Sequence, residues 1–335
     1  MAEKILSVDK LVTQLTTEWG PVIPVNEVSF DVYKGKTLGI VGESGSGKSI
    51  TALSIMRLIT PPLGNVIGGA IWLNDQNLLQ LSATDMRKVR GNQISMIFQE
   101  PMTSLNPVFT IGSQLKETIQ LHQNLNPKAA RAHAIELLNL VGIPAPEKRM
   151  DEYPHQLSGG MRQRVMIAMA LSSNPQILIA DEPTTALDVT IQAQILDLLC
   201  KLQTELGMGI ILITHDLGVV AEVCHEVAVM YCGRIVEKAP VKELFTRPQH
   251  PYTQGLLSSI PALEAGNNTG NKRLETISGL VPSLHQLPVG CVFQDRCGNV
   301  QQNCRGEYGM PVIEEKYPGH FAACFYPLGI DKHYT

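Results

Sequence analysis

The stretch KTLGIVGESGSGKS, residues 36–49, decides the fold. A β-rich apolar run meets a glycine-rich loop, and a helical stretch follows. Residues 42–49 fit the pattern G-x-x-x-x-G-K-S/T in the strand–loop–helix context that this pattern requires, which a plain glycine-rich turn would not explain. Glycines let the backbone curl so that successive N–H groups converge on phosphate oxygens, and the helix N-terminus adds its positive dipole end. The sequence therefore predicts a phosphate-binding loop in an α/β domain.

The side chains of this loop have separate expected roles. Lys48 would reach the β- and γ-phosphates of ATP, and the Ser49 hydroxyl would bind Mg²⁺. We expect the nucleotide to contact the following residues of the loop and of the first helical turn: Gly42, Ser44, Gly45, Ser46, Gly47, Lys48, Ser49 and Ile50.

A second predicted part of this site is the stretch QILIADEP, residues 176–183. An apolar strand ends in Asp181, which would hold Mg²⁺ directly or through water, and Glu182 would polarise the attacking water as catalytic base. Phosphoryl transfer depends on positioning and charge neutralisation more than on covalent chemistry, so few groups suffice. The two carboxylates could instead be charges near a helix N-terminus. Together with the upstream loop, however, they favour catalysis.

Short apolar runs alternate with helical stretches through about residue 245, as in an α/β domain. The runs at 94–98, 176–181 and 209–214 are continuous rather than alternating, which is typical of strands covered on both faces. Between Pro107 and Leu157 the strand signal disappears and helical spacing takes over. We therefore expect an α/β domain over residues 1–247, with a helical subdomain inserted at about 107–172.

The composition changes after Phe245. TRPQHPYTQGLLSSIP carries three prolines, and the polar EAGNNTGNK that follows is a loop or linker signal. We expect a small, loop-rich extension over residues 248–335.

The net charge of the 335-residue chain is −4, which gives no indication of nucleic acid as the main partner. No run of about 18 apolar residues occurs, so the sequence predicts no membrane span.

Further motifs identify the class. LSGGMRQR (157–164), together with GESGSGKS, ADEP, TALD (185–188) and the histidine of LITHD, resembles the ATP-binding subunit of an ABC transporter. The resemblance covers roughly the whole chain, and five motifs occur in the family's order. It implies that residues 1–247 form an ABC ATPase domain with a P-loop fold and a mixed sheet as its core. It also implies an ATP-hydrolysing subunit with ATP and Mg²⁺ as cofactors.

In that family two subunits pack head to tail, and the signature motif of one faces the ATP of the other. The resemblance implies that contacts in trans come from Gln156, Ser158, Gly159, Gly160 and Asp188. Ser158 is also a good N-cap, and the two glycines would let a phosphate approach bare backbone N–H groups. Asp188 can at the same time cap the helix VTIQAQILDLL. Met161 stands where the family often has glutamine, so one side-chain contact of the family is lacking here.

Three further roles follow from the resemblance. Gln99 matches the lid glutamine that touches Mg²⁺ and the attacking water, although a solvated loop glutamine is the alternative. His215 matches the histidine that contacts the γ-phosphate. Trp19 is the candidate for the aromatic residue that stacks on adenine, with an ordinary hydrophobic plug as the alternative.

The tail narrows the resemblance. PQHPYTQGLLSSIP, FQEPMTSLNP, YPHQLSGGM and ADEPTTALDVT resemble subunits of oligopeptide, dipeptide and nickel importers. This implies a peripheral protein on the cytoplasmic face of a bacterial or archaeal cell membrane, such as a cell inner membrane. Its partners would be a paralogous ATPase subunit in a heterodimer, two transmembrane permeases and an extracytoplasmic solute-binding protein. The solute would be a di- or oligopeptide, with nickel or another small solute as the alternative; a non-transport ABC ATPase is a further alternative.

Four of the seven cysteines gather near the end, at Cys291, Cys297, Cys304 and Cys324. A disulfide framework needs an oxidising compartment, whereas an ATPase works where ATP is. Zinc usually requires close C-x2–4-C pairs, which are lacking here. Wider spacing suits a 4Fe–4S cluster, and members of the importer family carry one in this tail. The family commonly reads RCP where this chain has Arg296, Cys297 and Gly298. We expect a 4Fe–4S cluster, with Zn²⁺ or unligated thiols as alternatives. The other three cysteines, Cys200, Cys224 and Cys232, are expected to be buried thiols.

Overall fold

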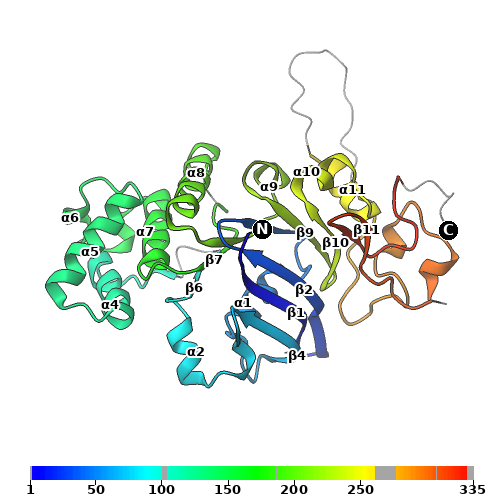
Figure 1. The fold of residues 1–335 in the computed structure, drawn as a ribbon, viewed down its shortest axis with the longest axis horizontal. Coiled ribbons are helices and arrows are strands. Elements are labelled where there is room, and N and C mark those ends of the chain that lie inside the picture. Colours follow the sequence, from blue (N-terminus) through cyan, green and yellow to red (C-terminus); the bar gives the residue numbers. More distant parts are fainter. Residues whose placement is uncertain (1, 100–103, 186, 261–276, 307, 330–335) are drawn as a thin grey trace, which may run out of the picture. The chain divides into compact units, whose positions relative to one another are not determined.

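The computed structural model describes the chain except for residues 1, 100–103, 186, 261–276, 307 and 330–335 (Figure 1). Its contacts divide the chain into two compact units. The first unit comprises residues 1–7, 31–37 and 72–213, and the second comprises residues 8–30, 38–71 and 214–335.

Parallel strands form the core of the first unit. β6 (Ile94–Ile97), β7 (Ile177–Asp181) and β8 (Gly209–Ile213) are neighbours, with Ile94 opposite Ile177 and Ile177 opposite Gly209. Nearly every side chain of these strands is buried, as the continuous apolar runs predict. All three strands lie where the sequence places them.

Helices fill the stretch between β6 and β7. Within the described residues of this stretch they are α4 (Ile111–Gln123), α5 (Pro127–Leu140), α6 (Pro146–Arg149), the 3₁₀ helix η2 (Pro154–Gln156) and α7 (Gly159–Leu171). α4, α5 and α7 pack on one another (Figure 1). Local sequence sets the helix starts: the Thr110 hydroxyl accepts from the Ser113 N–H, and Asn126 caps α5 just ahead of a proline at its first position. The expected helical character of this stretch is confirmed.

The rest of the first unit consists of short elements and one long helix. β5 (Gln76–Asn77) pairs with the end of β4, and the 3₁₀ helix η1 (Leu78–Gln80) leads to α2 (Ala83–Val89). α8 (Val189–Leu206) begins at the cap residue Asp188 and ends at Gly207, which takes the left-handed conformation.

The second unit has a mixed sheet. β3 (Thr37–Val41) runs parallel to β9 (Glu226–Tyr231), which pairs antiparallel with β10 (Arg234–Pro240). β10 continues antiparallel to β12 (His320–Ala322), and β12 to β11 (Glu314–Tyr317). Strands from the tail therefore extend a sheet that contains the strand leading into the phosphate loop. β1 (Lys4–Thr17), β2 (Gly20–Tyr33) and β4 (Gly64–Leu73) have residues in both units.

The helices of the second unit are short. In the part of this unit that the structure describes, the α-helices are α1 (Lys48–Ile55), α9 (Leu217–Val223), α10 (Val241–Thr246) and α11 (Pro251–Ser258). Beyond α11 the described residues contain two 3₁₀ turns, η3 (Gln294–Arg296) and η4 (Gln302–Arg305), besides β11 and β12. The expectation of a loop-rich extension is met there.

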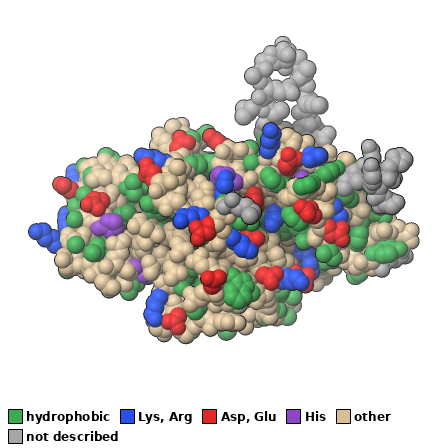
Figure 2. Space-filling view, in the orientation of Figure 1, with side chains coloured by type: hydrophobic (Ala, Val, Ile, Leu, Met, Phe, Trp, Pro, Cys, Tyr) green, Lys and Arg blue, Asp and Glu red, His purple; other side chains and the backbone are tan. Residues whose placement is uncertain are grey.

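None of the helices in the described part of the chain is long and apolar enough to cross a membrane. On the face drawn in Figure 2, basic side chains are interspersed with acidic ones.

Candidate functional site

The phosphate loop, Gly42–Ser49, connects β3 to α1 in the second unit. Gly42 and Gly47 have φ angles of 152° and 104°, a region that side-chain-bearing residues rarely adopt. A Cβ at Gly42 would collide with the carbonyl oxygen of Met230, and one at Gly47 with that of Pro24. These positions therefore need glycine both for conformation and for space.

Lys48 begins α1 and is nearly buried, at 6% exposure. Its ammonium group donates to the carbonyl oxygens of Gly42 (2.7 Å) and Glu43 (3.0 Å), both in the loop. The cation is thus held against the loop where the sequence predicts phosphate binding. Ser44 and Gly45 are exposed, Ser46 and Gly47 are buried, and Ser49 and Ile50 are partly buried.

The first unit places three residues of the predicted site, one Mg²⁺ ligand and two catalytic residues, at or just after the ends of its strands. Asp181, the last residue of β7, is 4% exposed. Glu182 follows with a left-handed φ of 46°, a strained conformation for glutamate. Its Oε2 accepts from Gln99 Nε2 (3.0 Å) and from the Thr185 hydroxyl (2.8 Å). Gln99 and Glu182, which the sequence places 83 residues apart, are therefore direct partners.

The signature motif starts α7. Ser158 is the N-cap, and its hydroxyl accepts from the Met161 N–H (3.3 Å), as predicted. Ser158 and Gly159 are exposed, and Gly160 is partly buried. A Cβ on Gly160 would approach Ile191 of α8 to 2.8 Å, so the second glycine is also needed for packing within the unit.

Two neighbours of the signature have structural roles as well. Asp188 is exposed and caps α8, with Oδ1 accepting from the Ile191 N–H (2.9 Å), which confirms the predicted capping. Gln156 is exposed, and its side-chain oxygen accepts from the Tyr153 N–H (2.8 Å). The roles in trans of Asp188 and Gln156 stay predictions.

The remaining nucleotide candidates lie in the second unit. His215 is exposed just after β8. Trp19 lies in the turn between β1 and β2 and is 84% exposed. An exposure of this size excludes a hydrophobic plug within the described residues and leaves the ring free to stack on a planar ligand.

The chain matches two family models in succession. Residues 25–185 match "ABC transporter", and residues 236–304 match "Oligopeptide/dipeptide transporter, C-terminal region". A probable peptide ABC transporter ATP-binding protein of Sinorhizobium fredii is 52% identical over 97% of this chain and 95% of its own length. The oligopeptide transport ATP-binding protein AppD of Bacillus subtilis is 53% identical, over 96% of both chains.

The chain belongs to the ATP-binding subunits of ABC transporters. A solved dimeric ATP-binding cassette bound to ADP and phosphate shares the fold of this ABC subunit, with a TM-score of 0.64 and 26% identity. The match covers 71% of this chain and 99% of that one. The predicted fold class and the predicted ATPase family are therefore confirmed.

The four clustered cysteines of this ABC subunit line one small cavity, together with His250, Phe293 and Tyr326. Cys291 and Cys304 are buried, and the Cys291 N–H donates to the Cys304 carbonyl (3.0 Å). Burial raises the pKa of the Cys291 thiol to about 11 and that of Cys324 to about 12. In the part of the chain that the structure describes, no group of three or more His, Cys, Asp or Glu side chains is arranged to hold a metal ion. The metal thus remains a prediction.

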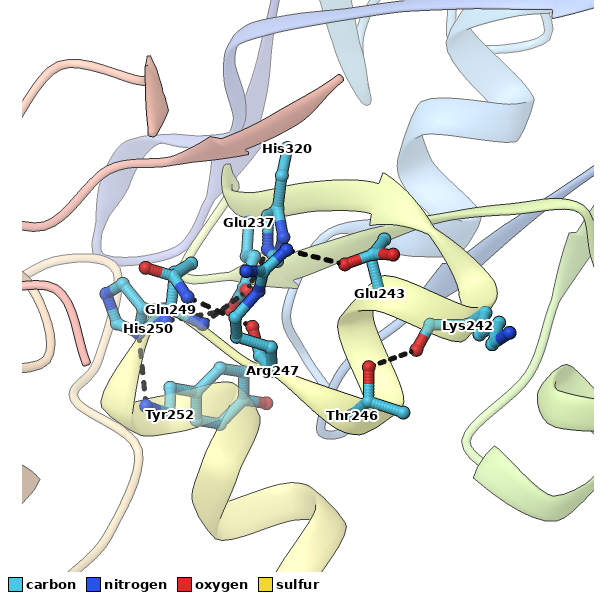
Figure 3. Close-up of polar contacts among 9 residues, drawn as sticks. All are labelled: Glu237, Lys242, Glu243, Thr246, Arg247, Gln249, His250, Tyr252 and His320. Atoms are coloured by element: carbon cyan, nitrogen blue, oxygen red, sulfur yellow. Dashed lines mark hydrogen bonds and ion pairs between the residues drawn. The ribbon is translucent and has the colours of Figure 1, made fainter. Parts of the chain in front are cut away.

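A buried polar network joins the extension to β10 (Figure 3). Glu237 is fully buried and accepts from the backbone N–H groups of Gln249 (2.6 Å) and His250 (2.9 Å). His320 Nε2, on β12, lies 2.7 Å from the same carboxylate. Burial lowers the pKa of His250 to about 4, so its ring is neutral, and Nδ1 accepts from the Tyr252 N–H (3.1 Å). One carboxylate therefore orients the PQHPY stretch.

Sequence reasoning missed two residues that connect the extension to the phosphate loop. Arg296 forms an ion pair with Glu43 of the loop (2.6 Å), and the Tyr252 hydroxyl accepts from the Glu43 N–H (2.9 Å). The only signals were the family-like PQHPYTQ stretch and the arginine just ahead of Cys297, and neither names its partner.

Proposed function

We propose that the chain binds MgATP through its phosphate loop and hydrolyses it to power solute import. Lys48 carries this proposal: its buried ammonium group lies 2.7 Å from a loop carbonyl, beside the glycines that leave the loop backbone bare. Ser49 and Asp181 are assigned to Mg²⁺, and Gln99 to Mg²⁺ and the attacking water. His215 is assigned to the γ-phosphate and Trp19 to adenine. A planar aromatic ring at 84% exposure supports the last assignment.

We assign the catalytic base to Glu182. The Gln99–Glu182 bond supports this role, because it brings a water-orienting amide to the carboxylate that would take the proton. The hydrogen bond from Thr185 restricts the same side chain further.

Two such subunits would share their nucleotides head to tail. The exposure of Ser158, Gly159 and Asp188 supports contacts in trans, as does the dimeric state of the similar cassette. Gln156 and Gly160 complete this proposed surface. We propose a paralogous ATPase chain as the second subunit.

Nucleotide titration tests the proposed phosphate loop of this chain and the proposed site that it completes on the partner. Lys48→Ala should weaken MgATP binding to the isolated subunit about a hundredfold, because the phosphates lose their buried cation. Ser158→Arg should leave that binding within about threefold and abolish turnover in the complex, because it spoils the site completed on the partner. Equal loss of binding in the two variants would contradict a shared head-to-tail site.

The proposed cargo is a di- or oligopeptide, since similar proteins are named as peptide, oligopeptide and dipeptide transport subunits. The partners would be two transmembrane permeases and an extracytoplasmic binding protein, with this chain on the cytoplasmic face of the cell membrane. In a reconstituted complex, dipeptides should stimulate ATP hydrolysis. Stimulation by Ni²⁺ and not by peptides would assign the alternative cargo.

We propose a division of the chain at residues 247 and 248, with an ATPase domain of residues 1–247 and an extension of residues 248–335. The helical subdomain would occupy about residues 107–172. Helices α4 to α7 within residues 111–171 support the inserted subdomain. The family model for the importer C-terminal region, which matches residues 236–304, supports a separate extension.

We propose further that Cys291, Cys297, Cys304 and Cys324 hold a 4Fe–4S cluster. Four sulfur donors line one cavity in a segment with little regular structure, which supports this proposal. A single zinc ion needs four sulfur atoms at about 2.3 Å, whereas a cluster is larger and suits sulfurs that line a cavity without converging on a point. When bound, the cluster would supply covalent ties between distant parts of the segment.

Metal analysis of protein purified without oxygen tests the cluster. We expect visible absorbance and about four irons per chain, both lost on Cys304→Ser. Cys200→Ser, outside the cluster, should keep them. Stoichiometric zinc without iron would replace the cluster by the zinc alternative, and free alkylation of all four native thiols would contradict both.

A further inference from the structure

The cysteine segment, residues 291–324, contributes a cation to the phosphate loop. Arg296 Nη1 lies 2.6 Å from Glu43 Oε2, and Nη2 lies 2.9 Å from Oε1, so the pair is bidentate. Both residues belong to the second unit and are 253 positions apart in the sequence. Bidentate arginine–carboxylate pairs fix orientation as well as distance.

The guanidinium of Arg296 is held firmly. Its side chain is only 4% exposed, and Nε donates to the Ser278 carbonyl (3.2 Å). The guanidinium carbon of Arg296 lies 5.8 Å from the ring centre of Tyr231 and 5.9 Å from that of Phe293. A guanidinium in contact with aromatic rings and a carbonyl has few alternative positions, so it acts as a fixed charge.

Glu43 is central to the loop's own hydrogen bonds. Its carbonyl accepts from Lys48 Nζ (3.0 Å) and from the Ser46 N–H (3.2 Å). Its N–H donates to the buried Tyr252 hydroxyl (2.9 Å). Glu43 is also the second residue of a loop that is expected to bind phosphate. Without a cation beside it, the negative charge of the Glu43 carboxylate would repel ATP.

We propose that Arg296 is a positioning residue for nucleotide binding: its guanidinium neutralises and fixes Glu43, so the cysteine segment sets the affinity of the phosphate loop for MgATP. The proposal rests on the proposed nucleotide site. Arg296 directly precedes Cys297. The conformation of the cysteine segment therefore determines where the Arg296 guanidinium lies. The extension is thus a part of the nucleotide site and more than an appendage to it.

Equilibrium titration of the full-length, anaerobically purified chain with MgATP tests this coupling. Arg296→Gln leaves the Glu43 anion beside the loop and should raise the Kd about tenfold. Arg305→Gln, an exposed arginine of the same segment, is the matched control and should leave the Kd unchanged. Arg296→Lys keeps the charge and should recover part of the loss, although it lacks the bidentate geometry.

The double variant separates charge from folding. Glu43→Gln with Arg296→Gln removes both charges and should return the Kd to within about threefold of the wild type. If Arg296→Gln acted by unfolding the extension, the double variant would be no better. A wild-type Kd in Arg296→Gln, or a double variant as weak as Arg296→Gln, would overturn the inference. If Lys48→Ala bound MgATP as the wild type does, the nucleotide site itself would be wrong, and the inference with it.

Discussion

The phosphate loop and the cysteine segment both belong to the second unit, and both have little regular secondary structure. Their backbones are kept in place by different means. The loop, residues 42–49, runs from the end of β3 into the first turn of α1, and its shape comes from glycines that local sequence supplies. The cysteine segment spans residues 291–324, and its described residues contain two 3₁₀ turns and two short strands. It is held by contacts to residues far along the chain, such as Glu43 and Glu237.

This difference explains what each region tolerates. A loop whose shape depends on backbone conformation fails at a single Cβ. A segment that depends on side-chain anchors and ligation fails at its anchors, while the residues between them are free to vary. Substitutions at matched glycines and at matched carboxylates can test this contrast.

The largest expected effect is at Gly47. Gly47→Ala should abolish MgATP binding, with a rise in Kd of at least about a hundredfold, because the new Cβ meets the Pro24 carbonyl and φ is 104°. Gly45 is the internal control: its φ is 79°, but a Cβ there would meet no atom within 4 Å from the described residues beyond its chain neighbours. Gly45→Ala should therefore raise the Kd for MgATP by a smaller factor than Gly47→Ala. Equal losses, measured by titration, would show that conformation alone governs the loop.

The next effect concerns the first unit. Glu182→Gln keeps the shape of the side chain and removes the charge that would polarise water. We expect ATP binding to persist and turnover in the complete complex to fall at least about tenfold. Glu205→Gln, on the far end of α8, is a surface control. Near-normal turnover would move the catalytic role away from Glu182 or to the partner subunit's site.

Local patterns were enough to predict much of this molecule. The strands around residues 94–98, 176–181 and 209–214 and the caps at Ser158 and Asp188 depend on neighbouring residues, so their positions could be read directly. The family followed from the order of the motifs.

Contacts between distant residues could not be predicted in this way. Nothing near Arg296 in the sequence specifies Glu43, because the pair forms only when the sheet brings both elements together. The same holds for Glu237 and His320, which look like surface residues in sequence yet are buried. Burial inverts the usual expectation for charged groups, and burial is a property of the fold.

Loss of a buried anchor such as Glu237 should destabilise the extension. Glu237→Gln puts an amide NH₂ against donors that now meet a carboxylate, so the free energy of unfolding should fall by about 2–5 kcal/mol. Glu243→Gln is the matched control in the same view (Figure 3), since its pair with Arg247 is exposed and worth about 0.5 kcal/mol or less. Urea unfolding and limited proteolysis of the extension measure both. Equal stability of the two variants would mean that the buried carboxylate does not anchor the extension.

The smallest effect is expected at Gly298, where this chain departs from the RCP that is common in similar importers. Among the described residues other than its chain neighbours, no atom lies within 4 Å of the place that a Cβ of residue 298 would take, and φ lies outside the left-handed region, in contrast to Gly42 and Gly47. Gly298→Ala should therefore leave MgATP affinity unchanged. It should stabilise the folded chain by about 0.4–1 kcal/mol, because alanine has fewer conformations to lose on folding. Denaturant unfolding of the anaerobically purified protein measures this change. A clear loss of stability in Gly298→Ala would show that the cysteine segment, like the phosphate loop, depends on bare backbone.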